Sequence, residues 1–143
     1  IDCIGRRLST LALHPFTHME PLQLTNYKNK QKYDMHYDYF GDNNPDSSER
    51  TTTMFVYLKS VDVTNGNCGG STMFPMLKDA SGDVLKVYPK STSAVMWSNR
   101  TFDGGLNENT LHGGEAVTCE GAQKIGMNVW FRDAEYGNLD DPR

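Results

Sequence analysis

Most of the chain is a series of short segments in which apolar and polar residues alternate, separated by clusters of turn-forming residues. The strongest is TTTMFVYLKSV (51–61), which is rich in β-branched and aromatic side chains. The pattern predicts further strands in LQLTNY (22–27), KYDMHYDYF (32–40), STMFPML (71–77), VLKVYPKSTSAVMWSN (84–99), TLHGGEAV (110–117) and KIGMNVWFRD (124–133). Many short strands with frequent turns indicate antiparallel sheets packed as a β-sandwich or barrel.

The segment IGRRLSTLAL (4–13) has a different period. Its apolar residues Ile4, Leu8, Leu11 and Leu13 recur at roughly helical spacing, which predicts a helix lying on a flat surface. A helix should end before Pro15, because the residue before proline avoids the α region.

The length of 143 residues suits one domain with its own core. A net charge of −4 argues against bulk nucleic-acid binding, and no apolar run approaches the ~18 residues of a membrane span. Cys3, Cys68 and Cys119 leave at least one cysteine unpaired and lack the spacing of a zinc or redox motif. Idle or buried thiols are the favoured interpretation, and any pairing stays open. The run GDNNPDSSER (41–50) contains no apolar residue and predicts a solvated loop.

His36 and Asp38 lie two positions apart in a predicted strand, so their side chains should share one face. An imidazole and a carboxylate there supply two ligands of the 2-His-1-carboxylate arrangement of non-haem Fe(II) oxygenases. Such a pair is also common by chance on protein surfaces. Of the other histidines, His112 opens a late strand, whereas His14 and His18 flank the helix end and should cap it or face solvent.

Lys124 lies twelve positions after His112, in a strand whose neighbouring residues are apolar or small. A lysine in such a strand either extends to the sheet edge or faces inward as a fixed cation for an acidic cosubstrate.

The order of these segments resembles the catalytic domain of prolyl 4-hydroxylases, within the Fe(II)/2-oxoglutarate-dependent dioxygenases. RRLSTLALHP resembles the family's helix and following turn, and EPLQLTNYKNKQKYDMHYDYF resembles its E-x-L-Q-x-x-x-Y and Y-x-x-H-x-D segments. RTTTMFVYLKSV, GGSTMFP, VYPKSTSAVMW, TLHGGEAV and GAQKIGMNVWFRD follow in family order. The resemblance implies a double-stranded β-helix (jelly-roll) core with a supporting N-terminal helix. It also implies that 1–143 is a single domain that lacks the family's N-terminal elements.

The resemblance assigns roles to individual residues. It implies Fe(II) ligands at His36, Asp38 and His112, and pairing of Lys124 with the distal carboxylate of 2-oxoglutarate. It places Tyr27, Tyr57 and Thr72 in the cosubstrate pocket, although both tyrosines also suit half-buried strand positions. It places Tyr33, Arg50 and Trp130 against the substrate, although Trp130 also suits the core.

Two departures from the family pattern concern the end of the chain. The family's lysine usually follows the second histidine by about ten residues, and here a longer turn in EAVTCEGAQK accommodates the difference. Arg132 stands where peptide-binding relatives often carry a histidine, which leaves the substrate identity open.

The function implied by the resemblance is hydroxylation of a C–H bond, foremost C4 of a prolyl residue in a peptide or protein, with release of succinate and CO2. L-ascorbate would re-reduce the iron, and loop 41–50 would serve as a lid over the substrate. The alternatives are a hydroxylase of a free amino acid or small metabolite, and a β-helix binding module without turnover. For the compartment, the endoplasmic reticulum lumen is favoured by analogy with eukaryotic relatives, and the cytoplasm is the alternative.

Overall fold

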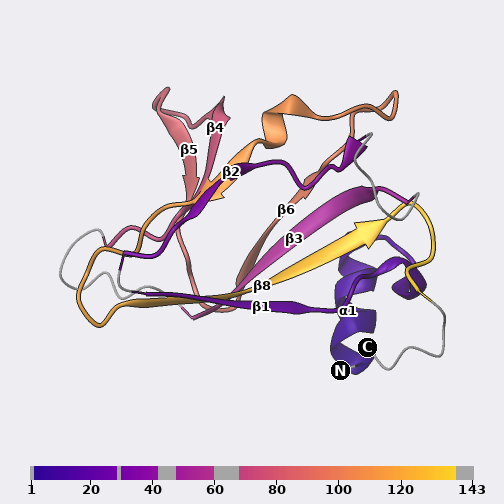
Figure 1. Cartoon of the computed structure of the whole chain (residues 1–143), viewed down its shortest axis with the longest axis horizontal. Helices are drawn as coiled ribbons and strands as arrows, with labels where there is room; N and C mark the ends of the chain where they lie inside the picture. The colour runs from indigo at the N-terminus through magenta and orange to yellow at the C-terminus, as the bar shows by residue number, and fades with distance from the viewer. Residues whose placement is uncertain (1, 29, 42–47, 60–67, 138–143) are drawn as a thin grey trace.

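The computed structural model describes residues 2–28, 30–41, 48–59 and 68–137, which form two antiparallel sheets with a helix packed against one of them (Figure 1). The first sheet has the strand order β1-β8-β3-β6 and the second has the order β2-β7-β4-β5. The elements are α1 (Asp2–Ala12), η1 (Phe16–His18), β1 (Gln23–Lys28), β2 (Tyr33–His36), β3 (Arg50–Lys59), β4 (Thr72–Lys78), β5 (Val84–Val87), β6 (Ser93–Ser98), η3 (Glu108–Thr110), β7 (His112–Gly114) and β8 (Gln123–Arg132). The expected mostly β, jelly-roll architecture with an N-terminal helix is confirmed. None of the helices in the described ranges is long and apolar enough to cross a membrane.

The strand β8 divides the interior into two regions, because successive side chains of a strand point to opposite faces. Met127, Val129 and Phe131 are buried on the face that packs against α1. Lys124, Asn128 and Trp130 line a cavity together with residues of the second sheet. One ten-residue strand therefore supplies both the core and a polar pocket.

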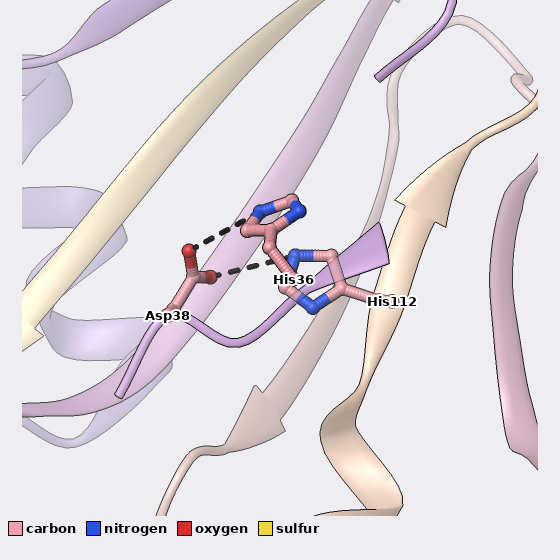
Figure 2. A group of neighbouring side chains, drawn as sticks. All are labelled: His36, Asp38 and His112. Carbon is pink, nitrogen blue, oxygen red and sulfur yellow. Dashed lines mark ion pairs between the residues drawn. The ribbon is translucent and has the colours of Figure 1, made fainter. Parts of the chain in front are cut away.

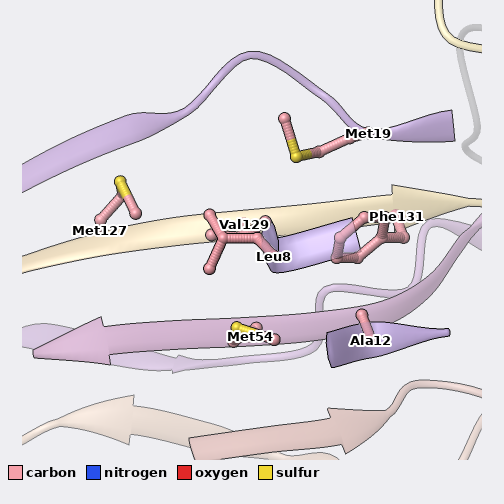
Figure 3. Close-up of a cluster of buried hydrophobic side chains, with 7 residues drawn as sticks. All are labelled: Leu8, Ala12, Met19, Met54, Met127, Val129 and Phe131. Carbon is pink, nitrogen blue, oxygen red and sulfur yellow. The ribbon is translucent and has the colours of Figure 1, made fainter. Parts of the chain in front are cut away.

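The core between α1 and the first sheet contains seven buried side chains (Figure 3). They are Leu8, Ala12, Met19, Met54, Met127, Val129 and Phe131.

The helix packs through a different face from the one predicted. Ile4, Leu11 and Leu13 are exposed, and of the four apolar residues only Leu8 is buried. Small residues decide the contact face. A Cβ atom on Gly5 would lie 2.4 Å from Cε2 of Phe16, so the helix packs closely there only because this residue is glycine.

The predicted strand 32–40 is shorter in the structure, since β2 ends at His36. The solvated-loop interpretation of 41–50 is wrong at its end, because Ser48 and Glu49 are buried and Arg50 begins β3. The Glu49 carboxylate accepts hydrogen bonds from the backbone amides of Phe40 and Gly41, which explains why so polar a segment turns inward. Residues 42–47, the centre of the expected lid, lie outside the described residues.

The interpretation as idle or buried thiols is wrong for two of the three cysteines. Cys68 and Cys119 form a disulfide, with their Cα atoms 5.0 Å apart, and Cys3 is free and exposed. The bridge joins the segment before β4 to the turn before β8, where a β-bridge between Gly69 and Val117 also pairs the two segments. The pairing could not be read from the sequence, since 51 positions separate the two cysteines.

Candidate active site

Three side chains that can bind a metal converge at the junction of the two sheets. His36 ends β2, His112 begins β7 opposite it in register, and Asp38 follows two residues after β2 (Figure 2). Their ligand atoms all lie within 4.8 Å of one another. Nε2 of His36 lies 3.7 Å from Oδ1 of Asp38, and Nε2 of His112 lies 3.6 Å from its Oδ2.

Backbone carbonyls fix the tautomers of both histidines. Nδ1 of His36 lies 2.8 Å from the carbonyl oxygen of Asp34, and Nδ1 of His112 lies 2.8 Å from that of Thr110. A carbonyl oxygen can only accept, so each Nδ1 carries the proton and each Nε2 presents a lone pair toward Asp38. Burial also lowers the pKa of His112, which favours the neutral form that a metal requires.

These three residues adjoin a cavity of about 350 Å³. Its lining comes from both sheets and consists of Gln23, Tyr27, Tyr33, His36, Tyr37, Asp38, Arg50, Phe55, Thr72, Trp97, His112, Gly113, Gly114, Lys124, Asn128 and Trp130. Most of the residues to which the sequence analysis assigned a role therefore line this cavity.

Lys124 is a buried cation on the wall of this cavity, 3% exposed, rather than a residue at the sheet edge. Its Nζ lies 3.4 Å from Oγ1 of Thr72 and 4.9 Å from the centroid of the Phe55 ring. Among the described residues no carboxylate lies within ion-pair distance of it. Burial lowers the pKa of Lys124 to about 8, although the charge of Glu115 opposes the shift, so near neutral pH the cavity wall carries an ammonium group that suits an anionic ligand.

The residues expected around the cosubstrate lie in two layers. Tyr27 and Thr72 line the cavity, with the Tyr27 ring 5.6 Å from Nζ of Lys124. Tyr57 is fully buried and is not among the lining residues. Its hydroxyl donates to Thr72 Oγ1 at 2.8 Å, and burial raises its pKa to about 12, so Tyr57 is a neutral donor that orients Thr72.

The residues expected to contact the substrate, Tyr33, Arg50 and Trp130, also line the cavity. The Arg50 guanidinium lies over the Trp130 ring, 3.8 Å from its centroid, and donates two hydrogen bonds of 2.8 Å to the Glu20 carboxylate. A stacked and bidentate arginine has little rotational freedom, so Arg50 presents one fixed edge to the cavity.

Arg132 does not line the cavity. It is 3% exposed, donates to Oε1 of Glu20 at 2.8 Å and donates to the backbone oxygen of Ser48 at 2.9 Å. Burial raises the pKa of Glu20, but the hydrogen bonds and charges of Arg50 and Arg132 outweigh it, so the pKa lies below its ordinary value. The departure at Arg132 therefore concerns a buried ion cluster, not a direct contact in the pocket.

The expectation for His14 and His18 is wrong. Nε2 of His14 lies 2.8 Å from Oγ1 of Thr52 and the ring stacks on Phe131, while Nδ1 of His18 lies 2.9 Å from the Arg132 carbonyl oxygen. Both rings therefore hold the segment that follows α1 against the first sheet.

Several lining residues were missed by the sequence analysis. Asn128 lies between Lys124 and Trp130 at an even number of positions from each, so alternation along β8 could have identified it. Trp97 packs edge-on against His112, with ring centroids 4.7 Å apart, and no local signal predicts this because it depends on how β6 pairs with β3.

Comparison with known proteins identifies relatives along most of the chain. Residues 22–132 match the family model of the 2OG-Fe(II) oxygenase superfamily. Probable prolyl 4-hydroxylase 10 of Arabidopsis thaliana is 34% identical over 93% of this chain and 49% of its own length. Prolyl 4-hydroxylase 5 of the same plant is 31% identical over 95% of this chain and 50% of its own length. The chain spans about half the length of these relatives.

Solved structures agree with the fold. The viral collagen prolyl hydroxylase of Paramecium Bursaria Chlorella virus-1, solved as a 2OG complex, superposes with a TM-score of 0.72 at 28% identity, covering 93% of this chain and 71% of the other. A Pseudomonas putida prolyl-4-hydroxylase gives 0.57 at 19% identity over 95% of this chain and 65% of its own, which supports the fold alone. By the match over residues 22–132, the chain belongs to the 2OG-Fe(II) oxygenase superfamily, in which the relatives named here are prolyl hydroxylases.

Proposed function

We propose that the chain is the catalytic part of a prolyl 4-hydroxylase, an Fe(II)- and 2-oxoglutarate-dependent dioxygenase acting on C4 of a prolyl residue in a peptide or protein. The observation that carries the proposal is the shared cavity of the His36, Asp38 and His112 donors and the buried Lys124 ammonium. A binding module without turnover has no use for both features together. In this proposal 1–143 acts as a single domain.

The donor set fits Fe(II). Two neutral imidazoles and one carboxylate leave a divalent ion with a net positive charge and with open positions for other ligands. His36, Asp38 and His112 would hold the ion, with the Nε2 lone pairs already directed by the two backbone carbonyls. Bound Fe(II) would supply oxidative decarboxylation of 2-oxoglutarate to succinate and CO2, with one oxygen atom of O2 entering succinate and the other hydroxylating the substrate C–H bond.

The protein's own part is to orient and shield the reactants. Lys124 would pair with the far carboxylate of 2-oxoglutarate, and Thr72, held by Tyr57, would donate a hydrogen bond beside it. The rings of Tyr27 and Phe55 border Lys124 and keep water from this charge pair.

The cavity wall formed by Tyr33, Arg50 and Trp130 would bind the prime substrate. Tyr33 is 52% exposed, so this wall continues onto the surface, where a peptide could extend beyond the cavity. Aromatic faces suit the uncharged pyrrolidine ring of proline, and the fixed edge of Arg50 suits a peptide carbonyl. L-ascorbate would act as the reductant after turnovers that produce no hydroxylated product.

Succinate production is the test. We would measure it from 2-oxoglutarate and Fe(II) with a proline-rich peptide, with free proline, and with no prime substrate. The expected result is succinate coupled to 4-hydroxyproline with the peptide alone. Turnover with free proline but not the peptide would replace the proposal with a small-molecule hydroxylase. Iron binding without succinate in any arm would indicate a binding module.

The matched variant is Asp38→Ala, which should abolish both iron binding and succinate formation because only two neutral ligands remain. Retained iron affinity would contradict the ligand assignment. The variant Asp103→Ala serves as the control, since this exposed carboxylate lies on a surface turn and accepts a hydrogen bond from Thr101.

A further inference from the structure

A chain of buried hydrogen bonds reaches the Asp38 carboxylate from the first sheet. Nδ2 of Asn99 donates to Oγ1 of Thr53 at 2.9 Å, and Oγ1 of Thr53 donates to Oδ2 of Asp38 at 2.7 Å. Thr53 and Asn99 are fully buried and Asp38 is 4% exposed. Thr53 lies on β3 and Asn99 directly follows β6, so the chain links two neighbouring strands to a residue beyond the end of β2.

The direction of the chain is fixed by its chemistry. A hydroxyl group has one hydrogen, and an ionised carboxylate can only accept, so the Thr53 hydrogen goes to Asp38. The oxygen of that hydroxyl then accepts from the Asn99 amide nitrogen. Backbone bonds hold Asn99 in place, because its N–H donates to the Thr51 carbonyl and its carbonyl accepts from the Asn107 N–H. Asn99 is the first residue of an N-x-T triplet, which is an N-glycosylation acceptor sequence. Because Asn99 is completely buried, its side-chain amide makes this contact instead of carrying a surface glycan.

The Asp38 carboxylate needs such an anchor because the Arg50 guanidinium also attracts it. Nη1 of Arg50 lies 3.9 Å from Oδ1, on a guanidinium that is already fixed by Glu20 and Trp130. Asp38 also lies outside β2, so no strand hydrogen bonding holds its backbone in register with His36. Without the Thr53 bond, rotation toward Arg50 would form a stronger ion pair and turn the carboxylate away from the two Nε2 atoms.

We propose that Thr53 and Asn99 are positioning residues that hold the Asp38 carboxylate toward the two histidines and away from Arg50, and thereby set the metal affinity of the site. The inference rests on the proposed role of Asp38 as a metal ligand. Asn99 acts through Thr53, since its amide donates to the hydroxyl that in turn donates to Asp38.

The test is the affinity for Co(II), a redox-stable substitute for Fe(II), measured by calorimetry and by the visible absorption of the bound ion. Thr53→Val keeps the shape of the side chain and removes the hydroxyl, and we expect its dissociation constant to rise about 10- to 100-fold. Thr53→Ser keeps the hydroxyl and should bind within about threefold of the wild type. Thr51→Val is the matched control, because Thr51 lies on the same strand as Thr53 but its hydroxyl donates to the Phe131 carbonyl on β8 instead of to Asp38.

The role of Asn99 follows from a double-mutant cycle. Asn99→Ala should weaken Co(II) binding less than Thr53→Val, and the double variant should bind like Thr53→Val alone, since Asn99 has nothing further to orient.

Each outcome decides the proposal. Wild-type affinity in Thr53→Val, at an unchanged melting temperature in the metal-free protein, overturns it. If Thr53→Val does not fold, wild-type affinity in Asn99→Ala overturns it instead. If the wild-type protein binds no Co(II), the proposed function fails as well, whereas binding that is insensitive to both substitutions removes this inference only.

Discussion

Lys124 shows how one residue can cost stability in order to bind a ligand. Its ammonium group is buried among aromatic rings and lies beside the Thr72 hydroxyl, and burial lowers its pKa from 10.5 to about 8. A difference of that size corresponds to about 3 kcal/mol of unfavourable burial while the group is charged. An anion in the cavity would recover part of this free energy, which is why an unpaired buried lysine indicates an acidic ligand.

The shifted pKa of Lys124 predicts two opposite pH dependences. As pH rises past about 8 the folded protein loses this charge, so 2-oxoglutarate affinity should fall by up to about tenfold per pH unit. The unfolded chain keeps its proton up to about pH 10.5, so the contribution of Lys124 to the free energy of unfolding should rise over the same window. Calorimetric titration of the Mn(II)-loaded protein between pH 7 and about pH 9.5 measures the first effect.

The control ligand is 2-oxobutyrate, which keeps the oxoacid group and lacks the far carboxylate. Its weaker binding should not follow the Lys124 titration. Equal pH slopes for the two ligands would mean that Lys124 is not the group that pairs with 2-oxoglutarate. Lys124→Met should lose most of the difference in affinity between the two ligands.

The geometry of the candidate site could be predicted from the sequence only where residues of one continuous strand determine it. His36 and Asp38 were grouped as alternate residues of one strand, yet β2 ends at His36. Asp38 is held at the site by a buried hydrogen bond that the Thr53 hydroxyl donates to its carboxylate, and that contact depends on tertiary structure. Lys124 and Trp130 could be placed on one face because β8 continues without interruption between them.

At the scale of elements, β8 can form part of both the core and the pocket wall because residue 126 is a glycine. A Cβ atom on Gly126 would lie 2.2 Å from Cζ of Phe55, whose ring forms the floor beside Lys124. Gly126→Ala should push this ring into the cavity. We expect 2-oxoglutarate affinity to fall about tenfold and the free energy of unfolding to fall by about 1–3 kcal/mol.

Gly105→Ala is the control for this substitution, because its Cβ atom would make an ordinary contact of 3.5 Å with Thr101. Its stability should stay within about 0.5 kcal/mol of the wild type. Calorimetry and urea unfolding measure both variants, and a Gly126→Ala protein with unchanged affinity would show that Phe55 does not shape the cosubstrate pocket.

Helix α1 offers a test of which face supports the sheet. Leu8 is 9% exposed against Met54 and Val129, whereas Leu11 on the same helix is 68% exposed. Leu8→Ala should lower the free energy of unfolding by about 2–4 kcal/mol, and Leu11→Ala by less than about 0.5 kcal/mol. Urea denaturation followed by tryptophan fluorescence measures both, and equal losses would contradict the packing of α1 through Leu8.

The helix and strands differ in how far the sequence determined them. Strands such as β3 and β8 were predicted almost to their ends, because burial on both faces leaves a strong apolar and β-branched pattern. The buried face of α1 was not, because it is formed by Gly5, Ser9 and Ala12 around Leu8, and small residues carry no hydrophobic signal. The same limit explains the buried end of 41–50, where Glu49 is held by backbone amides.

At the scale of the whole molecule, the Cys68–Cys119 bridge joins two connecting segments that lead into different sheets. Cys68 precedes β4, which carries Thr72 in the second sheet, and Cys119 precedes β8, which carries Lys124 in the first. One covalent link therefore lies a few residues before both Thr72 and Lys124, the residues proposed to face the far carboxylate of 2-oxoglutarate. Such structural disulfides are typical of oxidising compartments.

The bridge predicts a dependence of stability and binding on oxidation state. It closes a span of 51 residues, for which the loss of chain entropy in the unfolded state corresponds to about 4 kcal/mol. We therefore expect the Cys68→Ser, Cys119→Ser double variant to lose about 2–4 kcal/mol of unfolding free energy. Its 2-oxoglutarate affinity should fall more than its Co(II) affinity, because Thr72 and Lys124 follow the two cysteines closely while His36 and Asp38 lie on another segment.

Urea unfolding with and without reductant measures the change in stability, and the two titrations measure the changes in affinity. Cys3→Ala is the control because that thiol is free and exposed. Equal stability of the oxidised wild type and the double variant would mean that non-covalent pairing, such as the bridge between Gly69 and Val117, already holds these two segments together.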